Sequence, residues 1–98
     1  MTEIEKEVRR SKLIKIACHY GLCNQLKKTL EELEELHEAV SGYIEGKDTK
    51  AHVIEEIADV EVMTEQLKIL FDAEDEADRV KEFKINRQLE RMGREIGR

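Results

Sequence analysis

Apolar residues recur at helical spacing along most of this chain. The longest pattern runs from Leu22 to Ile44, where spacings of three and four relate Leu22, Leu26, Leu30, Leu33, Leu36, Val40 and Ile44. Such spacing is typical of an amphipathic helix. Similar but shorter patterns predict a first helix from about Thr2 to Ala17, a third ending near Phe71, and a fourth from about Glu76 to Met92.

Glycine and small polar residues mark the predicted breaks between these helices. Gly21 predicts a break or bend, and residues 45–49 form the clearest loop, with Gly46 as the terminator of the second helix. Asp48 or Thr49 is the expected N-cap of the third helix. An acidic stretch from Asp72 to Asp78 precedes the fourth helix, and Gly93 and Gly97 predict a frayed tail.

Composition supports a single all-α domain covering residues 1–98. The chain has 98 residues, no proline, 41% charged residues and only 4% aromatic residues. A chain rich in strong helix formers and lacking helix breakers is expected to be helical. Four helices joined by short loops predict an antiparallel four-helix bundle. We expect a domain this small to complete its core by oligomerisation, as a homodimer or homotetramer.

Charge and hydropathy exclude several partners. Acidic residues outnumber basic ones by 23 to 17, so a basic surface for nucleic acid is not expected. The chain has no apolar run long enough to span a membrane and no secretory signal at its start. Cys18 and Cys23 are five residues apart, which matches neither a redox pair nor a zinc site. We therefore expect free thiols and a cytoplasmic location.

One carboxylate contradicts the apolar face on which it lies. An advance of about 100° per residue along the third helix groups its apolar positions in one sector. Glu56 falls in the middle of that sector and Asp59 at its edge. An unpaired buried charge costs several kcal/mol, so Glu56 indicates a site rather than a solvent-exposed face.

The second helix supplies possible partners for Glu56. Glu32 and Glu35 are three residues apart and therefore share one side of that helix. Packing of the two helices would bring Glu32, Glu35, Glu56 and Asp59 together, and such a group needs a cation to neutralise it. Oxygen ligands favour Mg²⁺ first and Mn²⁺ second, and Mg²⁺ commonly binds phosphates. The alternative is that each acidic run is a solvated helix face.

The fourth helix carries charge of the opposite sign. Lys84, Arg87 and Arg91 share one face, which suits the binding of a polyphosphate between this helix and the acidic group. An ordinary solvent-facing basic helix has the same spacing.

Histidine spacing argues against a di-iron site. Glu34 and His37 form one ExxH pair, whereas di-iron bundles need two such pairs on two helices. The third helix has Glu56 and Asp59 at the corresponding spacing, so His37 is expected to be a surface residue.

The acidic motifs together resemble those of a known family. Glu31, Glu32 and Glu35, followed after about twenty residues by Glu56 and Asp59, look like the EExxE…ExxD signature of MazG-like nucleoside triphosphate pyrophosphohydrolases. The flanking segments HYGLCNQLKKTLEELEEL, HVIEEIADVEVMTEQLKIL and KEFKINRQLER also resemble the short, phage-type members, over about residues 19–91. The resemblance implies an all-α oligomeric enzyme. It would use Mg²⁺, or Mn²⁺ as a substitute, to cleave a nucleoside triphosphate to the monophosphate and pyrophosphate.

The resemblance also implies roles for individual residues. Glu32, Glu35, Glu56 and Asp59 match the metal ligands, and Glu31 or Glu35 would act as the catalytic base. The implied substrate-binding residues are Tyr20, Asn24, Gln25, Lys28, Lys84 and Arg87. The chain lacks tryptophan, which departs from members that hold the base between indole rings and leaves the base preference open.

A non-catalytic helical interaction module with an acidic surface is the main alternative. It accounts equally well for the composition and the periodicity, but it does not account for Glu56 among Val53, Val60 and Met63.

Overall fold

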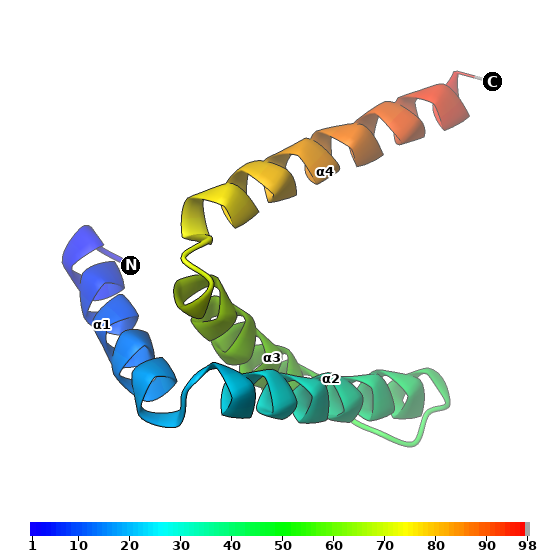
Figure 1. Ribbon diagram of the computed structural model, residues 1–98. Helices are drawn as coiled ribbons and strands as arrows, with labels where there is room; N and C mark the ends of the chain where they lie inside the picture. The colour runs from blue at the N-terminus through cyan, green and yellow to red at the C-terminus, as the bar shows by residue number, and fades with distance from the viewer. Residues whose placement is uncertain (98) are drawn as a thin grey trace.

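The computed structural model describes residues 1–97, which form four α-helices (Figure 1). These are α1 (Glu3–Tyr20), α2 (Leu22–Ile44), α3 (Lys50–Leu70) and α4 (Glu74–Ile96). No strand occurs among the described residues. The predicted all-α class and the number of helices are confirmed.

The ends of α1 differ from the prediction by a few residues. Thr2 caps its start, because the Thr2 side chain accepts a hydrogen bond from the Glu5 backbone N–H while the Glu5 carboxylate accepts one from the Thr2 N–H. The helix continues to Tyr20, past the predicted end at Ala17. It stops at Gly21, whose φ of 83° and ψ of 166° lie in a region open essentially to glycine alone.

The predicted loop between α2 and α3 is confirmed. Gly46 has a φ of 74°, so the chain reverses there at little steric cost. Thr49, rather than Asp48, caps α3 by accepting a hydrogen bond from the His52 backbone N–H at 3.1 Å.

The fourth helix is longer at both ends than predicted. The helix begins at Glu74, not Glu76, and continues through Gly93 to Ile96, where a frayed tail was expected. Three carboxylates in its first turn, those of Glu74, Asp75 and Glu76, interact favourably with the helix dipole. A single glycine lowers helix stability by only about 1 kcal/mol, which explains why the helix passes Gly93.

The helices α2 and α3 form an antiparallel pair, and α1 packs at one end of this pair, chiefly against α3 (Figure 1). α4 packs only against α3, near the turn that joins them, and then projects from the other helices. A bidentate ion pair from Arg10 to Glu74 ties the start of α4 to α1, with its shortest contact at 2.6 Å. The radius of gyration is 16.7 Å, compared with about 13 Å for a compact domain of this size.

The residues that α2 buries lie on the flank of its leucine stripe. Its buried residues are Gln25, Thr29, Glu32 and Ala39. In the leucine stripe, Leu36 is half-buried and the other members are exposed, most strongly Leu30 and Ile44 at 68% and 79%. The polar flank of α2 therefore faces α3, and the hydrophobic core of the described chain is small: Leu13, Ala17, Ala39 and Met63.

None of the four helices is both long and apolar enough to cross a membrane within residues 1–97.

Candidate metal centre

Four carboxylates from two helices meet at the α2–α3 interface. Glu32 and Glu35 come from α2, and Glu56 and Asp59 come from α3, each pair three residues apart. One oxygen of each carboxylate lies within 4.8 Å of the others. The predicted convergence of these side chains is therefore observed, while their role as metal ligands stays a prediction.

The four side chains differ in burial. Glu32 and Glu56 are each 8% exposed, whereas Glu35 and Asp59 are exposed at the rim. The group therefore has two carboxylates in the helix interface and two that solvent can reach. This arrangement leaves one open side for a substrate.

Each buried carboxylate is held at one oxygen only. The Lys28 ammonium lies 3.3 Å from Oε1 of Glu32, and Nε2 of His52 lies 3.3 Å from Oε1 of Glu56. The second oxygen, Oε2, of both carboxylates is buried with no hydrogen-bond partner. A buried polar atom left without a partner costs about 1–3 kcal/mol, and more when it is charged.

The donor set fits a hard divalent cation. Four carboxylates face at most two positive charges, those of Lys28 and a protonated His52, so negative charge remains. Carboxylate oxygens are the usual ligands of Mg²⁺ and Mn²⁺. A cation among the four residues would neutralise the remaining charge.

Lys28 lies beside two glutamates at the rim. Its ammonium is 3.3 Å from Glu32 and 3.3 Å from Glu31. The hydrogen bonds to Glu32 and then to Glu31 raise the pKa of Lys28 above its ordinary value, so it stays charged at neutral pH. Glu31, a predicted catalytic residue, is exposed at the same edge.

His52 is a site residue that sequence reasoning missed. Its Nδ1 lies 2.8 Å from Oδ2 of Asp48, and its Nε2 faces Glu56. The hydrogen bond to Asp48 raises the pKa of His52, and the same contact lowers the pKa of Asp48. The spacing of four residues from Asp48 to His52 and from His52 to Glu56 was the available signal, because such residues neighbour one another on a helix.

Gln25 is buried between α2 and α3. It is 5% exposed, and its side-chain amide donates to Oε1 of Gln66 at 2.7 Å. The Thr29 hydroxyl in turn donates to the Gln25 carbonyl at 2.7 Å. The amide therefore links α2 to α3, and the contact of Gln25 with a nucleoside stays a prediction. Gln66 was missed, since one glutamine in a helix carries no distinctive spacing.

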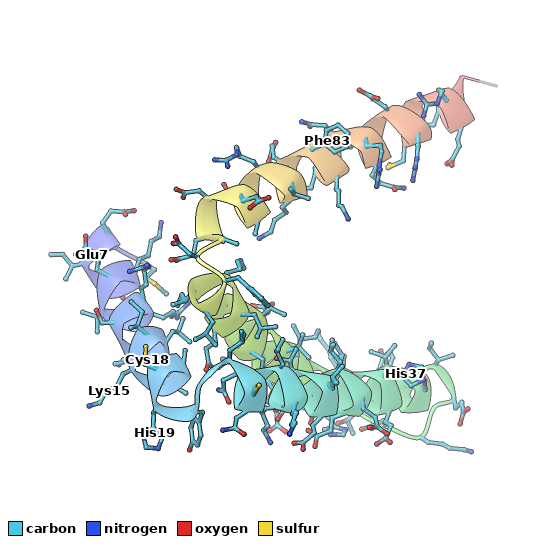
Figure 2. The ribbon with its side chains drawn as sticks, in the orientation of Figure 1. Glu7, Lys15, Cys18, His19, His37 and Phe83 are labelled. Atoms are coloured by element: carbon cyan, nitrogen blue, oxygen red, sulfur yellow. The ribbon has the colours of Figure 1, made fainter. Side chains whose placement is uncertain are left out.

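Tyr20 and Asn24 lie at the turn between α1 and α2. Both are exposed, and the Asn24 amide donates to the Tyr20 carbonyl at 2.8 Å. The Tyr20 ring meets the ring of His19 edge-on, with centroids 4.7 Å apart; Figure 2 shows His19 at this end of α1. Both predicted residues remain accessible to a ligand.

Lys84 and Arg87 lie on the projecting helix α4, where both are exposed. The Arg87 guanidinium lies over the Phe83 ring, 5.8 Å from its centroid, and Phe83 stands away from the other helices in Figure 2. α4 does not pack against α2. A single chain therefore does not bring these basic residues beside the carboxylates.

His37, Cys18 and Cys23 are exposed, and the two cysteines are free thiols, as predicted. His37 lies near the far end of α2 (Figure 2). The assignment of the metal centre thus rests on its own residues and their geometry. No family model, curated protein or solved structure matches this chain.

Proposed function

We propose that this protein is a Mg²⁺-dependent nucleoside triphosphate pyrophosphohydrolase, which converts a ribo- or deoxynucleoside triphosphate to the monophosphate and pyrophosphate. The observation that carries the proposal is the pair of buried carboxylates, Glu32 and Glu56, each with an unpartnered oxygen. The resemblance of the acidic motifs to MazG-like enzymes supports the reaction type. The proposed substrate class and the free thiols of this protein fit a reducing, cytoplasmic compartment.

In this proposal Glu32, Glu35, Glu56 and Asp59 hold Mg²⁺, with Mn²⁺ as a substitute. A bound ion would neutralise phosphate charge and make a bound water more acidic. The two buried ligands fix the position of the site within the helix interface, and the two exposed ligands leave its outer side open. The four carboxylates therefore already lie together in the absence of substrate.

The rim residues would act on the attacking water and on the phosphates. Glu31 or Glu35 is exposed and can accept the proton of a water that cleaves the bond between the α- and β-phosphates. Lys28 stays charged beside Glu31 and can donate hydrogen bonds to a phosphate oxygen. Tyr20 and Asn24 would lie at the nucleoside end of the substrate.

A second copy of the chain would supply the missing basic residues. The leucine stripe of α2 and most of the apolar side chains of α4 are exposed, including Leu89, which is 58% exposed. Surfaces of this kind are typical of an interface between subunits. We propose a homodimer or homotetramer in which Lys84 and Arg87 of one chain reach the carboxylates of its partner and bind the leaving pyrophosphate.

The test of the reaction is product analysis with Mg²⁺ over a panel of ribo- and deoxynucleoside triphosphates. We expect pyrophosphate and a monophosphate from the wild-type protein. Glu56→Gln should lower kcat/KM by more than about 100-fold, since residues that merely support a metal ligand already contribute about 10- to 100-fold. Glu34→Gln, an exposed residue of α2 outside the carboxylate group, is the matched control and should retain full activity.

Two results would contradict the proposal. Full activity of Glu56→Gln would show that this carboxylate binds no catalytic metal. No pyrophosphate from any nucleotide, with either Mg²⁺ or Mn²⁺, would instead favour the non-catalytic interaction module.

A further inference from the structure

Asp48, in the α2–α3 loop, is followed at spacings of four residues by His52 and Glu56 on the first turns of α3. The His52 ring lies between the two carboxylates, with Nδ1 at 2.8 Å from Asp48 and Nε2 at 3.3 Å from Glu56. Glu56 is the one carboxylate of α3 that is buried in the metal centre. His52 thus connects an element outside the centre, the α2–α3 loop, to a residue inside it.

We propose that His52 is a positioning residue that holds Glu56 in the orientation needed to bind a divalent cation; this inference rests on the proposed function. Contact with His52 occupies Oε1 of Glu56 and leaves the buried Oε2 as the unpartnered oxygen. Asp48 fixes the imidazole from its other side, so the ring cannot turn away without breaking its own hydrogen bond. Side chains that support metal ligands in this way are worth about 10- to 100-fold in metal affinity.

The two buried carboxylates are supported by different means. Lys28 is a flexible cation, and its ammonium divides its contacts between Glu31 and Glu32. His52 is a rigid ring with one nitrogen on each of two carboxylates. We expect His52 to restrict the Glu56 carboxylate more strongly, because histidine has fewer rotatable side-chain bonds than lysine and its ring is also bonded to Asp48.

Positioning and charge predict opposite effects on cation binding. A protonated His52 next to the site repels a divalent cation, so removal of the ring would tighten binding if charge dominated. Asp48 lies against the same ring and offsets that charge. We therefore expect the loss of positioning to outweigh the loss of charge, so removal of the ring should weaken cation binding.

The test is a titration of the 98-residue chain with Mn²⁺ alone, monitored by electron paramagnetic resonance without nucleotide. His52→Gln keeps an amide nitrogen near the position of Nε2 and should bind Mn²⁺ close to the wild-type level. His52→Asn reaches only toward Asp48, and His52→Ala reaches neither carboxylate. Both should bind Mn²⁺ about 10- to 100-fold more weakly. His37→Ala, on the exposed surface of α2, is the control and should bind normally.

Unfolding by urea, followed by circular dichroism, separates positioning from a structural role. We expect the Gln and Asn variants to have similar free energies of unfolding while their Mn²⁺ affinities differ. Equal Mn²⁺ affinity of the Gln, Asn and Ala variants, or tighter binding by His52→Ala, would overturn the inference while leaving the cation site intact. Nitrogen coupling in the Mn²⁺ spectrum that is lost in His52→Gln would also overturn it, because His52 would then be a direct ligand. Failure of the wild-type protein to bind Mn²⁺ would overturn the cation site and this inference together.

Discussion

The burial of the carboxylates Glu32 and Glu56 lowers the stability of the folded chain, and the proposed function explains why they are there. Their Oε2 atoms are buried without partners, in a group of four like charges. A protein selected for stability alone would place apolar side chains at an interface of two helices. The metal-free chain therefore bears a cost at this site that a bound cation would remove.

The charge of Glu56 should lower the free energy of unfolding when no metal is bound. In the presence of a chelator, Glu56→Gln should raise the free energy of unfolding by about 1 kcal/mol, because a neutral amide removes one like charge and can donate to a neighbouring oxygen. In the wild-type protein, Mg²⁺ at 100 times its dissociation constant should add about 2.7 kcal/mol, and in the variant it should add nothing.

Urea denaturation with and without Mg²⁺, at one protein concentration, measures both effects. Glu34→Gln should change the free energy of unfolding by no more than about 0.5 kcal/mol in either condition, as expected of a surface substitution. A destabilised Glu56→Gln protein that still gained stability from Mg²⁺ would refute this account of the carboxylates.

At the scale of secondary-structure elements, the turn between α1 and α2 depends on a single glycine. Gly21 is the last residue before α2, and no side chain caps the start of that helix. A Cβ added there would meet no atom within 4 Å, so space is not the constraint. The constraint is the backbone, because φ of 83° with ψ of 166° is strained for any other residue.

Substitution of alanine for Gly21 and for Gly93 should therefore change the free energy of unfolding in opposite directions. Gly21→Ala should lower the free energy of unfolding by about 1–3 kcal/mol. Gly93→Ala, inside α4 and also free of contacts, should raise helix stability by about 0.5–1 kcal/mol, because alanine loses less backbone entropy. Thermal unfolding followed by circular dichroism compares the two. Equal changes at both positions would mean that the α1–α2 turn tolerates a different backbone conformation.

At the scale of the whole molecule, the single chain leaves too much apolar surface exposed. The leucine stripe of α2 faces outward, and α4 contributes no buried residue within the part of the chain that the structure describes. On α4, Ile85, Leu89, Met92 and Ile96 form one exposed stripe at helical spacing, while Lys84, Arg87, Arg91 and Arg94 lie on another face. The apolar stripe suits packing on a second copy, and the basic face suits its acidic centre.

Mixing two inactive chains tests whether the site is shared. Glu56→Gln retains the basic residues of α4, and a Lys84→Ala/Arg87→Ala double variant retains the four carboxylates. When the two are unfolded together and refolded at equal concentrations, half of the dimers should be mixed, and each mixed dimer has one complete site. Activity should then recover to about a quarter of the wild-type level. No recovery, despite dimers in sedimentation analysis, would mean that α4 serves its own chain, whereas full activity of the double variant alone would mean that these basic residues take no part.

The sequence by itself determined the helices and the composition of the carboxylate group. Strong helix formers and periodic leucines predict four helices, and glycine and threonine mark where α2 ends and α3 begins. Glu32, Glu35, Glu56 and Asp59 could be named because a spacing of three fixes two side chains on one face whatever the helix packs against.

Only the tertiary structure decided which faces meet. The leucine spacing predicted an amphipathic α2, whereas the residues buried on this helix are Gln25, Thr29, Glu32 and Ala39. Periodicity defines the faces of a helix but not its partner, and that choice depends on contacts summed over both helices and any further copy. For the same reason the Gln25–Gln66 bond, the support of Glu56 by His52, and the projection of α4 appear only once the helices are placed in space.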